Sequence, residues 1–212
     1  MKVSPGLASE PAREGATRAS ATAYFLREIG HYIYAGDTAL HIAAAAYRPD
    51  IATVLVANGA DVGARNRRGA EPLHYASDGE PGSDRWNPEA QTATLEYLLR
   101  ADADPNCVDK SGVAPLHRAV RTRCAAAVSV LLAHGADPRR ENGSGSTPLH
   151  LAVQTTGRGG SGTVSAKEQQ ARIIHLLLAH GARLTDTDTR GAQWIKDTLL
   201  SENINFLIVN RL

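Results

Sequence analysis

Thr147-Pro148-Leu149-His150 is one copy of a short block that decides the fold of this chain. The block occurs four times in one fixed frame, and its histidines are separated by 33, 43 and 33 residues. The other copies are Thr38-Ala39-Leu40-His41, Glu71-Pro72-Leu73-His74 and Ala114-Pro115-Leu116-His117. A glycine precedes each histidine by five residues: Gly36, Gly69, Gly112 and Gly145. Self-similarity at this period indicates a stacked array of small units, here numbered 1 to 4 by their histidines.

A second block closes each unit after an apolar stretch. Its copies are Gly59-Ala60-Asp61, Asp102-Ala103-Asp104, Gly135-Ala136-Asp137 and Gly181-Ala182-Arg183. The full pattern, best seen from Gly112 to Asp137, resembles the ankyrin repeat. The resemblance covers roughly residues 31 to 212. It implies an all-α solenoid of helix-turn-helix units with β-hairpin-like turns. It also implies a protein-binding role without chemistry of its own.

The repeat frame predicts the domain organisation. Residues 1–19 are rich in small, polar and charged residues, which predicts a flexible tail. Residues 20–212 are expected to form a single repeat domain, with units near 33–65, 66–108, 109–141 and 142–187 and a degenerate cap at 188–212. A helix starting at Ala21, with Phe25, Leu26, Ile29 and Ile33 as its apolar positions, is expected to cover the first unit.

Within each unit the residue types suit helix ends. Thr38 and Thr147 can cap the inner helices through their hydroxyls. Prolines occupy the first helical position of units 2 to 4, at Pro72, Pro115 and Pro148. The block leucines are expected in the core: Leu40, Leu73, Leu116 and Leu149. Gly59, Gly135 and Gly181 are expected to end the outer helices in a left-handed conformation, with Asp102 replacing glycine in unit 2.

Units 2 and 4 carry insertions of ten and thirteen residues, in Asp78 to Gln91 and Thr155 to Gln170. The tail of each insertion has helix-start chemistry. Asn87-Pro88-Glu89 indicates a capped start, and Ser165 to Glu168 matches a capping box. Both outer helices are therefore expected to begin about one turn early. The rest of each insertion is expected to protrude as a loop, and both loops should lie on the same edge.

Composition excludes several classes of function. A net charge of +1 lacks the strong basic excess of a general nucleic-acid binder. The chain has no apolar run of membrane-spanning length. Cys107 and Cys124 fall at opposite ends of the array, so we expect reduced thiols and a cytoplasmic protein rather than a disulfide.

The sequence predicts no enzyme, no cofactor and no metal site. His41, His74, His117 and His150 are each about one helix layer apart, near 10 Å, which is too far to share an ion. We expect them instead to bond the backbone of the adjacent hairpin. Gly157 to Gly162 matches a dinucleotide fingerprint, but it follows a predicted helix rather than a strand, so we interpret it as a loop.

The candidate binding residues are cations on predicted hairpin tips and near inner helices. They are Arg65, Arg67, Arg68, Lys110, Arg121, Arg139, Arg140 and Arg190. One interpretation is solvated arginines on exposed turns; the other is a cationic surface for an acidic partner segment. Trp86 either packs back near Leu95 or is an exposed interface anchor.

The C-terminal end leaves two interpretations open. Ile204 to Leu212 is apolar on nearly every side, whereas a terminal repeat usually has a polar outer face. The segment is either a short packed cap or a contact with a partner or second copy. The first hypothesis is therefore a monomeric scaffold that binds a partner protein and binds neither nucleic acid nor membrane. The partner segment that contacts the arginines is expected to be acidic. The alternative is a self-associating structural component.

Overall fold

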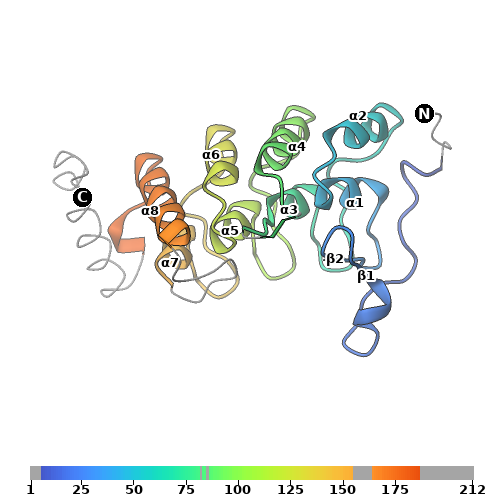
Figure 1. Ribbon diagram of the computed structural model, residues 1–212, viewed down its shortest axis with the longest axis horizontal. Helices are drawn as coiled ribbons and strands as arrows, with labels where there is room; N and C mark the ends of the chain where they lie inside the picture. Colours follow the sequence, from blue (N-terminus) through green and yellow to red (C-terminus); the bar gives the residue numbers. More distant parts are fainter. Residues whose placement is uncertain (1–5, 82, 85, 155–163, 187–212) are drawn as a thin grey trace.

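The computed structural model describes residues 6–81, 83–84, 86–154 and 164–186. In this part of the chain, successive helix pairs stand side by side in a row (Figure 1). The inner helices are α1 (Ala39–Ala45), α3 (Pro72–Ser77), α5 (Pro115–Arg121) and α7 (Pro148–Val153). The outer helices are α2 (Pro49–Ala57), α4 (Pro88–Arg100), α6 (Ala125–Ala133) and α8 (Val164–Ala179). The predicted all-α solenoid is confirmed.

The array has two layers of helices. Each inner helix packs on the inner helix of the next unit, and the outer helices do the same among themselves. The short helix η2 (Leu184–Asp186) follows α8 and contacts α7. The four block leucines are at most 1% exposed, as expected for residues that point into the stack: Leu40, Leu73, Leu116 and Leu149. Alanines fill most of the remaining core, which lets neighbouring helices approach closely.

The hairpin turns connect neighbouring units through their backbones. The Lys110 N–H donates to the Arg68 carbonyl at 2.9 Å, and the Gly143 N–H donates to the Ser111 carbonyl at 2.8 Å. A side chain at the start of each of these turns accepts backbone N–H groups across its tip; these are Asn66, Asp109 and Asn142. Such Asx turns hold the tips in a fixed geometry.

The block histidines join each unit to the next. In unit 2, the Glu71 N–H donates to His74 Nδ1 at 3.1 Å, so the ring proton is on Nε2. His74 Nε2 then donates to the Val113 carbonyl of the next hairpin at 2.9 Å. His41 and His117 make the same two bonds in units 1 and 3. The predicted hydrogen bonds to the adjacent hairpin are confirmed for these three histidines.

Several predicted helix ends are also found. Asn87 caps α4 by accepting the Ala90 N–H at 3.0 Å, and Thr147 caps α7 by accepting the His150 N–H at 3.1 Å. Asp102 has a φ of 68°, in the left-handed region where the other units have glycine. The Thr38 hydroxyl lies 3.0 Å from His41 Nδ1.

The predicted capping box at Ser165 is wrong. α8 already includes Val164, so Ser165 lies inside the first turn of the helix. An N-cap residue must have non-helical backbone angles, which Ser165 does not have. The residue before α8 in the sequence, Thr163, is also of capping type but lies outside the described residues.

The N-terminal region differs from both predictions made for it. The helix expected from Ala21 is replaced by a short 3₁₀ helix, η1 (Ala21–Tyr24), and a small antiparallel hairpin. Its strands are β1 (Phe25–Leu26) and β2 (His31–Tyr32), and Phe25 pairs with Tyr32. Gly30, with a φ of 63°, makes the turn between them. A helix through this position would need a right-handed conformation at Gly30.

Residues 6–19 pack against unit 1, so the prediction of a flexible tail is wrong for this segment. The Ala12 N–H donates to the Asp37 carbonyl at 2.7 Å, and the Gly36 N–H donates to the Ala12 carbonyl at 2.8 Å. Ala8 and Ala16 are 1% and 4% exposed. Small side chains allow the backbone to lie directly on the first turn, and Gly15 has no room for a Cβ because the Ala35 nitrogen would be 2.3 Å away.

The C-terminal predictions concern residues outside the described part of the chain. These are the degenerate unit with Trp194 and Lys196, and the apolar segment from Ile204 to Leu212. The second insertion is outside it between residues 155 and 163.

Candidate functional site

A groove of about 720 Å³ lies over the inner helices; we call it the inner-helix groove. One wall is the β1–β2 hairpin, from Glu28 to Tyr32. The opposite wall is the unit 2 loop, of which the structure describes residues 78–81, 83–84 and 86–87; Asp78 to Pro81, Ser83 and Trp86 line the groove. The floor comes from the C-terminal ends of α1, α3 and α5 and the residues that follow them. Three segments far apart in sequence therefore build one site.

Aromatic residues are concentrated in this groove. Four of the six tyrosines and one of the two tryptophans line it: Tyr32, Tyr34, Tyr47, Tyr75 and Trp86. Several of their polar atoms bond to the protein. The Tyr47 hydroxyl donates to the Asp78 carbonyl, and Trp86 Nε1 donates to Gln91 Oε1 at 2.9 Å. The polar atoms of Tyr47 and Trp86 are therefore satisfied within the fold.

A buried polar cluster holds the hairpin wall on the floor. The Asp37 carboxylate, 2% exposed, accepts the Tyr75 hydroxyl at 2.8 Å and the Asn66 amide at 2.8 Å. Burial and the adjacent Asp37 carboxylate raise the pKa of Tyr75, so this hydroxyl remains a donor. The His31 ring stacks on Tyr75 with centroids 4.3 Å apart. Asp37 and Tyr75 thus join unit 1 to unit 2 beneath the groove.

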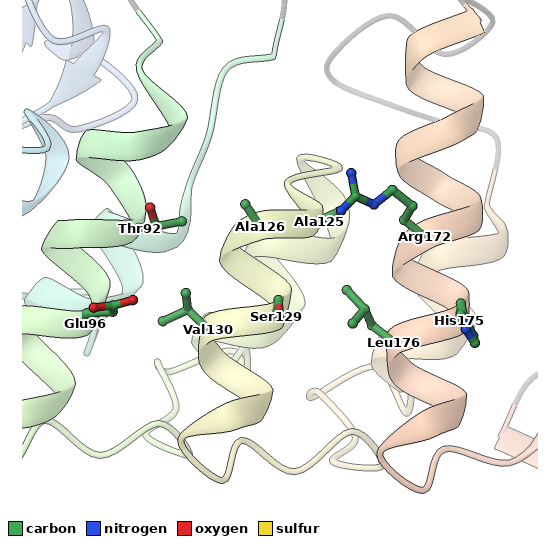
Figure 2. A pocket seen from close by; sticks show the side chains of 9 residues that line it. All are labelled: Thr92, Glu96, Ala125, Ala126, Ser129, Val130, Arg172, His175 and Leu176. Atoms are coloured by element: carbon green, nitrogen blue, oxygen red, sulfur yellow. The ribbon is translucent and has the colours of Figure 1, made fainter.

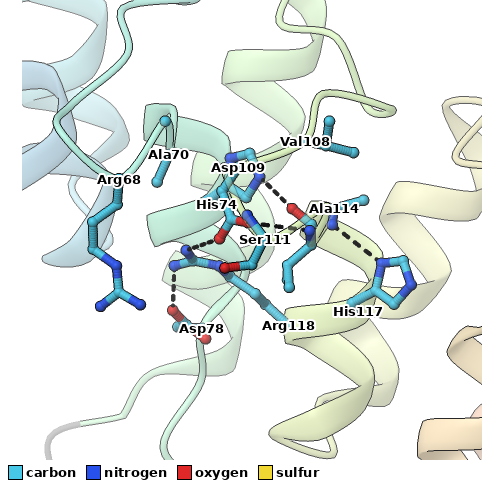
Figure 3. Close-up of polar contacts among 12 residues, drawn as sticks. Arg68, Ala70, His74, Asp78, Val108, Asp109, Ser111, Ala114, His117 and Arg118 are labelled. Carbon is cyan, nitrogen blue, oxygen red and sulfur yellow. Dashed lines mark hydrogen bonds and ion pairs between the residues drawn. The ribbon is translucent and has the colours of Figure 1, made fainter. Parts of the chain in front are cut away.

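Arg118 anchors the opposite wall, as Figure 3 shows. It is 8% exposed, and its guanidinium donates to Asp78 Oδ2 at 2.8 Å and to Asp109 Oδ2 at 3.3 Å. Burial opposes the charge of Arg118, yet the two carboxylates raise its pKa. Burial would also raise the pKa of Asp109, but N–H donors from Ser111 and Val113, together with Arg118, hold it below its usual value. This ion-pair network fixes the start of the unit 2 loop.

The first residues of the unit 2 loop are packed, contrary to the prediction that the loop protrudes. The Gly79 N–H lies 3.3 Å from Thr122 Oγ1, its acceptor, and a Cβ at Gly79 would lie 2.1 Å from Cys124 Sγ. Trp86 is half-buried and packs back on the core, and Gln91 at the start of α4 accepts its N–H. The Gln91 amide in turn donates to the Ala76 carbonyl at 2.9 Å. Asp78 and Gly79 are therefore packed against residues of unit 3 and do not protrude.

The predicted cations divide into two groups. Arg68 and Arg121 line the groove. Arg68 lies over the Tyr34 ring at 5.0 Å and donates to the Tyr34 hydroxyl at 3.0 Å. Lys110 is exposed on the next hairpin tip and bonded to Arg68 through the backbone. These three cations and Trp86 are the predicted residues that the fold brings to the groove or its edge.

The other predicted cations have contacts elsewhere. Arg65 donates to the Gly69 and Val108 carbonyls, and Arg67 donates to the Ala16 carbonyl at 2.6 Å. Arg139 is paired with Asp186 at 3.2 Å. Arg140 is half-buried at the junction of units 3 and 4, and Arg190 lies outside the described residues. Sequence reasoning missed the hairpin wall, although Gly30, which lies in the sequence between Phe25 and Tyr32, is a turn signal.

The described residues offer little for catalysis. Burial raises the pKa of Cys124 to about 11 and that of Cys107 further, so neither thiol is an activated nucleophile. Both cysteines are free. No group of three potential metal-ligating side chains occurs among residues 6–154 and 164–186, leaving aside the small gaps at 82 and 85. In the same part of the chain, every helix is too short or too polar to cross a membrane.

Comparison with known proteins identifies the repeat. Family models described as "Ankyrin repeat" and "Ankyrin repeats (3 copies)" match residues 35–67 and 89–188, together more than half of the chain. The E3 ubiquitin-protein ligase KEG of Arabidopsis thaliana is 38% identical over 99 residues, 44% of this chain and 5% of that protein. Ankyrin repeat and SOCS box protein 16 of Mus musculus is 38% identical over 89 residues, 41% of this chain and 19% of that protein.

The chain therefore spans less than a fifth of either relative. Each of the two relatives matches less than half of this chain and is a much longer protein. Ankyrin repeats are general protein–protein interaction modules. On the repeat frame, the stacked helix pairs and the two family matches, the chain belongs to the ankyrin-repeat family.

Proposed function

We propose that the chain is a non-catalytic scaffold that binds an extended, acidic segment of a partner protein along the inner-helix groove. The observation that carries the proposal is the concentration of aromatic rings and arginines in one preformed groove. Tyrosine, tryptophan and arginine are the residue types most enriched among those that dominate binding energy at protein interfaces.

The walls of the groove are held before any partner arrives. The stacking of His31 on Tyr75 holds the hairpin side, and Arg118 with Asp78 holds the loop side. A fixed site loses less conformational entropy on binding than one that must first become ordered. This supports a binding role for the groove rather than a purely structural one.

Charge supports an acidic partner. Arg118 is neutralised by two carboxylates, so the exposed cations are Arg68 and Arg121 in the groove and Lys110 at its edge, while Glu28 and Glu80 also line the groove. Arg121 lies 3.8 Å from Asp78, which it shares with Arg118. A partner carboxylate would give these exposed cations a charge-assisted bond, and it would be steered toward them at low ionic strength.

Affinity capture with a matched control tests the proposal. Full-length wild type, Arg68→Ser/Lys110→Ser and Lys167→Ser/Arg183→Ser would be immobilised and exposed to the same lysate. The control residues are exposed on α8 and just after it, and the two variants change the charge equally. We expect the groove variant alone to lose partners that wild type releases as salt rises. Identical capture by all three proteins would refute the groove as the binding surface.

The same proposal places the protein in the cytoplasm as a monomer. Two buried free thiols, Cys107 and Cys124, support a reducing compartment. Sedimentation at high concentration checks the monomer, since dimers would favour the alternative of a self-associating component.

A further inference from the structure

A second depression lies on the outer helices, over α6 and between α4 and α8 (Figure 2). We call it the outer-helix slot; its volume is about 500 Å³. It follows from unequal helix lengths, since α6 has nine residues whereas α4 has 13 and α8 has 16. At 1.5 Å per residue, α4 and α8 are longer by about 6 Å and about 10 Å. The two insertions lengthen the flanking helices and leave α6 short between them.

The floor of the slot consists mostly of apolar residues with small side chains. The sequence of α6 is AAAVSVLLA, in which Ser129 is the one polar residue. Ala126, Ser129 and Ala133 are exposed, and Val130 is half-buried. The exposed side of an outer helix normally carries charged residues, as α4 does with Glu89, Glu96 and Arg100. α6 therefore presents a surface on which another helix can lie closely.

The walls of the slot differ in charge. On the α4 wall, Glu96 is already paired with Arg100 at 2.9 Å. On the α8 wall, Arg172 and His175 follow each other at a spacing of three residues and so share one face. Within the part of the chain that the structure describes, Arg172 has no carboxylate at ion-pairing distance. Figure 2 shows its guanidinium extending toward Ala125 at the start of α6.

We propose that the outer-helix slot binds an amphipathic helix of a partner protein, with its apolar stripe on α6 and an acidic edge facing Arg172 and His175. Floor and walls are all helical, and their backbone groups are bonded within the helices, so the slot offers no edge for an added strand. An apolar floor bordered by a cationic wall matches a helix that is apolar on one face and acidic on one flank. This surface is distinct from the inner-helix groove.

Two designed helical peptides test the chemistry directly. Both are about 18 residues long with an Ala/Leu stripe, and one flank carries either Glu or Lys. Fluorescence anisotropy with the full chain should show binding of the Glu peptide, and binding of the Lys peptide that is weaker by at least about tenfold. Arg172→Glu should reverse this order. Failure of both peptides to bind, or an unchanged order in Arg172→Glu, would overturn the proposal.

Matched variants locate the binding. Ser129→Arg on the floor of the slot should abolish binding of the Glu peptide, whereas Thr53→Arg, at the equivalent position of α2, should leave it unchanged. Both variants must show the same melting curve as wild type. Arg68→Ser/Lys110→Ser should also leave peptide binding intact, which separates this proposal from the one for the inner-helix groove. A dimer in sedimentation that Ser129→Arg converts to monomer would instead assign the slot to a second copy.

Discussion

Acidification from neutral pH should destabilise this array because three of its block histidines, His41, His74 and His117, are buried in the neutral form. His74 is fully buried, with Nδ1 accepting the Glu71 N–H and Nε2 donating to the Val113 carbonyl. Burial, followed by the nearby Arg118 charge, lowers the pKa of His74 to about 4, although Val113, Asp109 and Asp78 act in the opposite direction. The same burial lowers the pKa of His41 and of His117.

The sign and size of the effect follow from proton linkage. In the unfolded chain His74 titrates near 6.5, so between about pH 6.5 and pH 4 the unfolded state binds more protons than the folded state. Stability is fully present above pH 6.5 and is lost as the pH falls toward 4. A difference of about 2.5 pKa units corresponds to about 3 kcal/mol from His74 alone. His41 and His117 act in the same direction. Burial raises the pKa of Glu71, so at pH values just above the usual glutamate pKa the folded state binds more protons at Glu71 than the unfolded state. This partly opposes the loss of stability caused by the histidines.

Urea unfolding followed by circular dichroism would measure this loss. We expect the free energy of unfolding to fall by several kcal/mol between about pH 7.5 and about pH 4.5. His74→Gln should be less stable at neutral pH, by about 1–3 kcal/mol if one backbone partner is left unsatisfied. Its pH slope should be shallower than that of wild type. A flat profile in wild type, or equal slopes in the two proteins, would refute the reasoning.

Three other substitutions test the packing of the array by denaturant melts. Leu116→Ala should cost about 2–5 kcal/mol, the range for buried leucines, and a loss under about 1 kcal/mol would mean that the residue is outside the stack. Gly79→Ala should destabilise far more than Gly63→Ala, because its Cβ would meet Cys124 Sγ whereas that of Gly63 has open space beyond 3.5 Å; equal melts would contradict a packed loop. Arg118→Met should cost about 3–5 kcal/mol by removing the guanidinium that pairs with the buried Asp109 and the half-buried Asp78, and a neutral result would show that the ion-pair network is not needed.

The periodic part of the fold could be predicted from the sequence because its determinants are local and repeat in register. Leu73 and Leu116 occupy the same frame position and are both buried. The histidine bonds to the next hairpin follow from the same frame. Asn87 and Pro88 start α4 where their capping chemistry places the start.

The N-terminal region could not be predicted in this way. Phe25, Ile29 and Ile33 have helical spacing, but Gly30 turns the chain and Phe25 pairs with Tyr32 instead. Ala8 and Ala16 are buried because they are small enough for direct backbone contact with unit 1. Residues 6–19 contain few large apolar residues, and this composition predicts a flexible tail.

The inner-helix groove was predicted only through some of its residues. Arg68, Arg121 and Trp86 were identified as cations and an aromatic residue on exposed segments. Their neighbours come from the β1–β2 hairpin and the unit 2 loop, whose paths lie outside the repeat frame. Arg65 and Arg139 show the converse error, since charge on a predicted tip does not reveal that the side chain is already bonded.

The departures from the repeat frame, rather than the repeats themselves, give this chain its individual surfaces. The insertion in unit 2 acts on both sides of the array: its first residues form a wall of the inner-helix groove, and its last residues lengthen α4 beside the outer-helix slot. Substitutions at frame positions such as Leu116 should therefore change stability without changing specificity. Substitutions at exposed positions beside the insertions, such as Arg172, should change what is bound and leave the melting curve nearly unchanged. A variant set divided along this line would show whether binding and folding are separable in this protein.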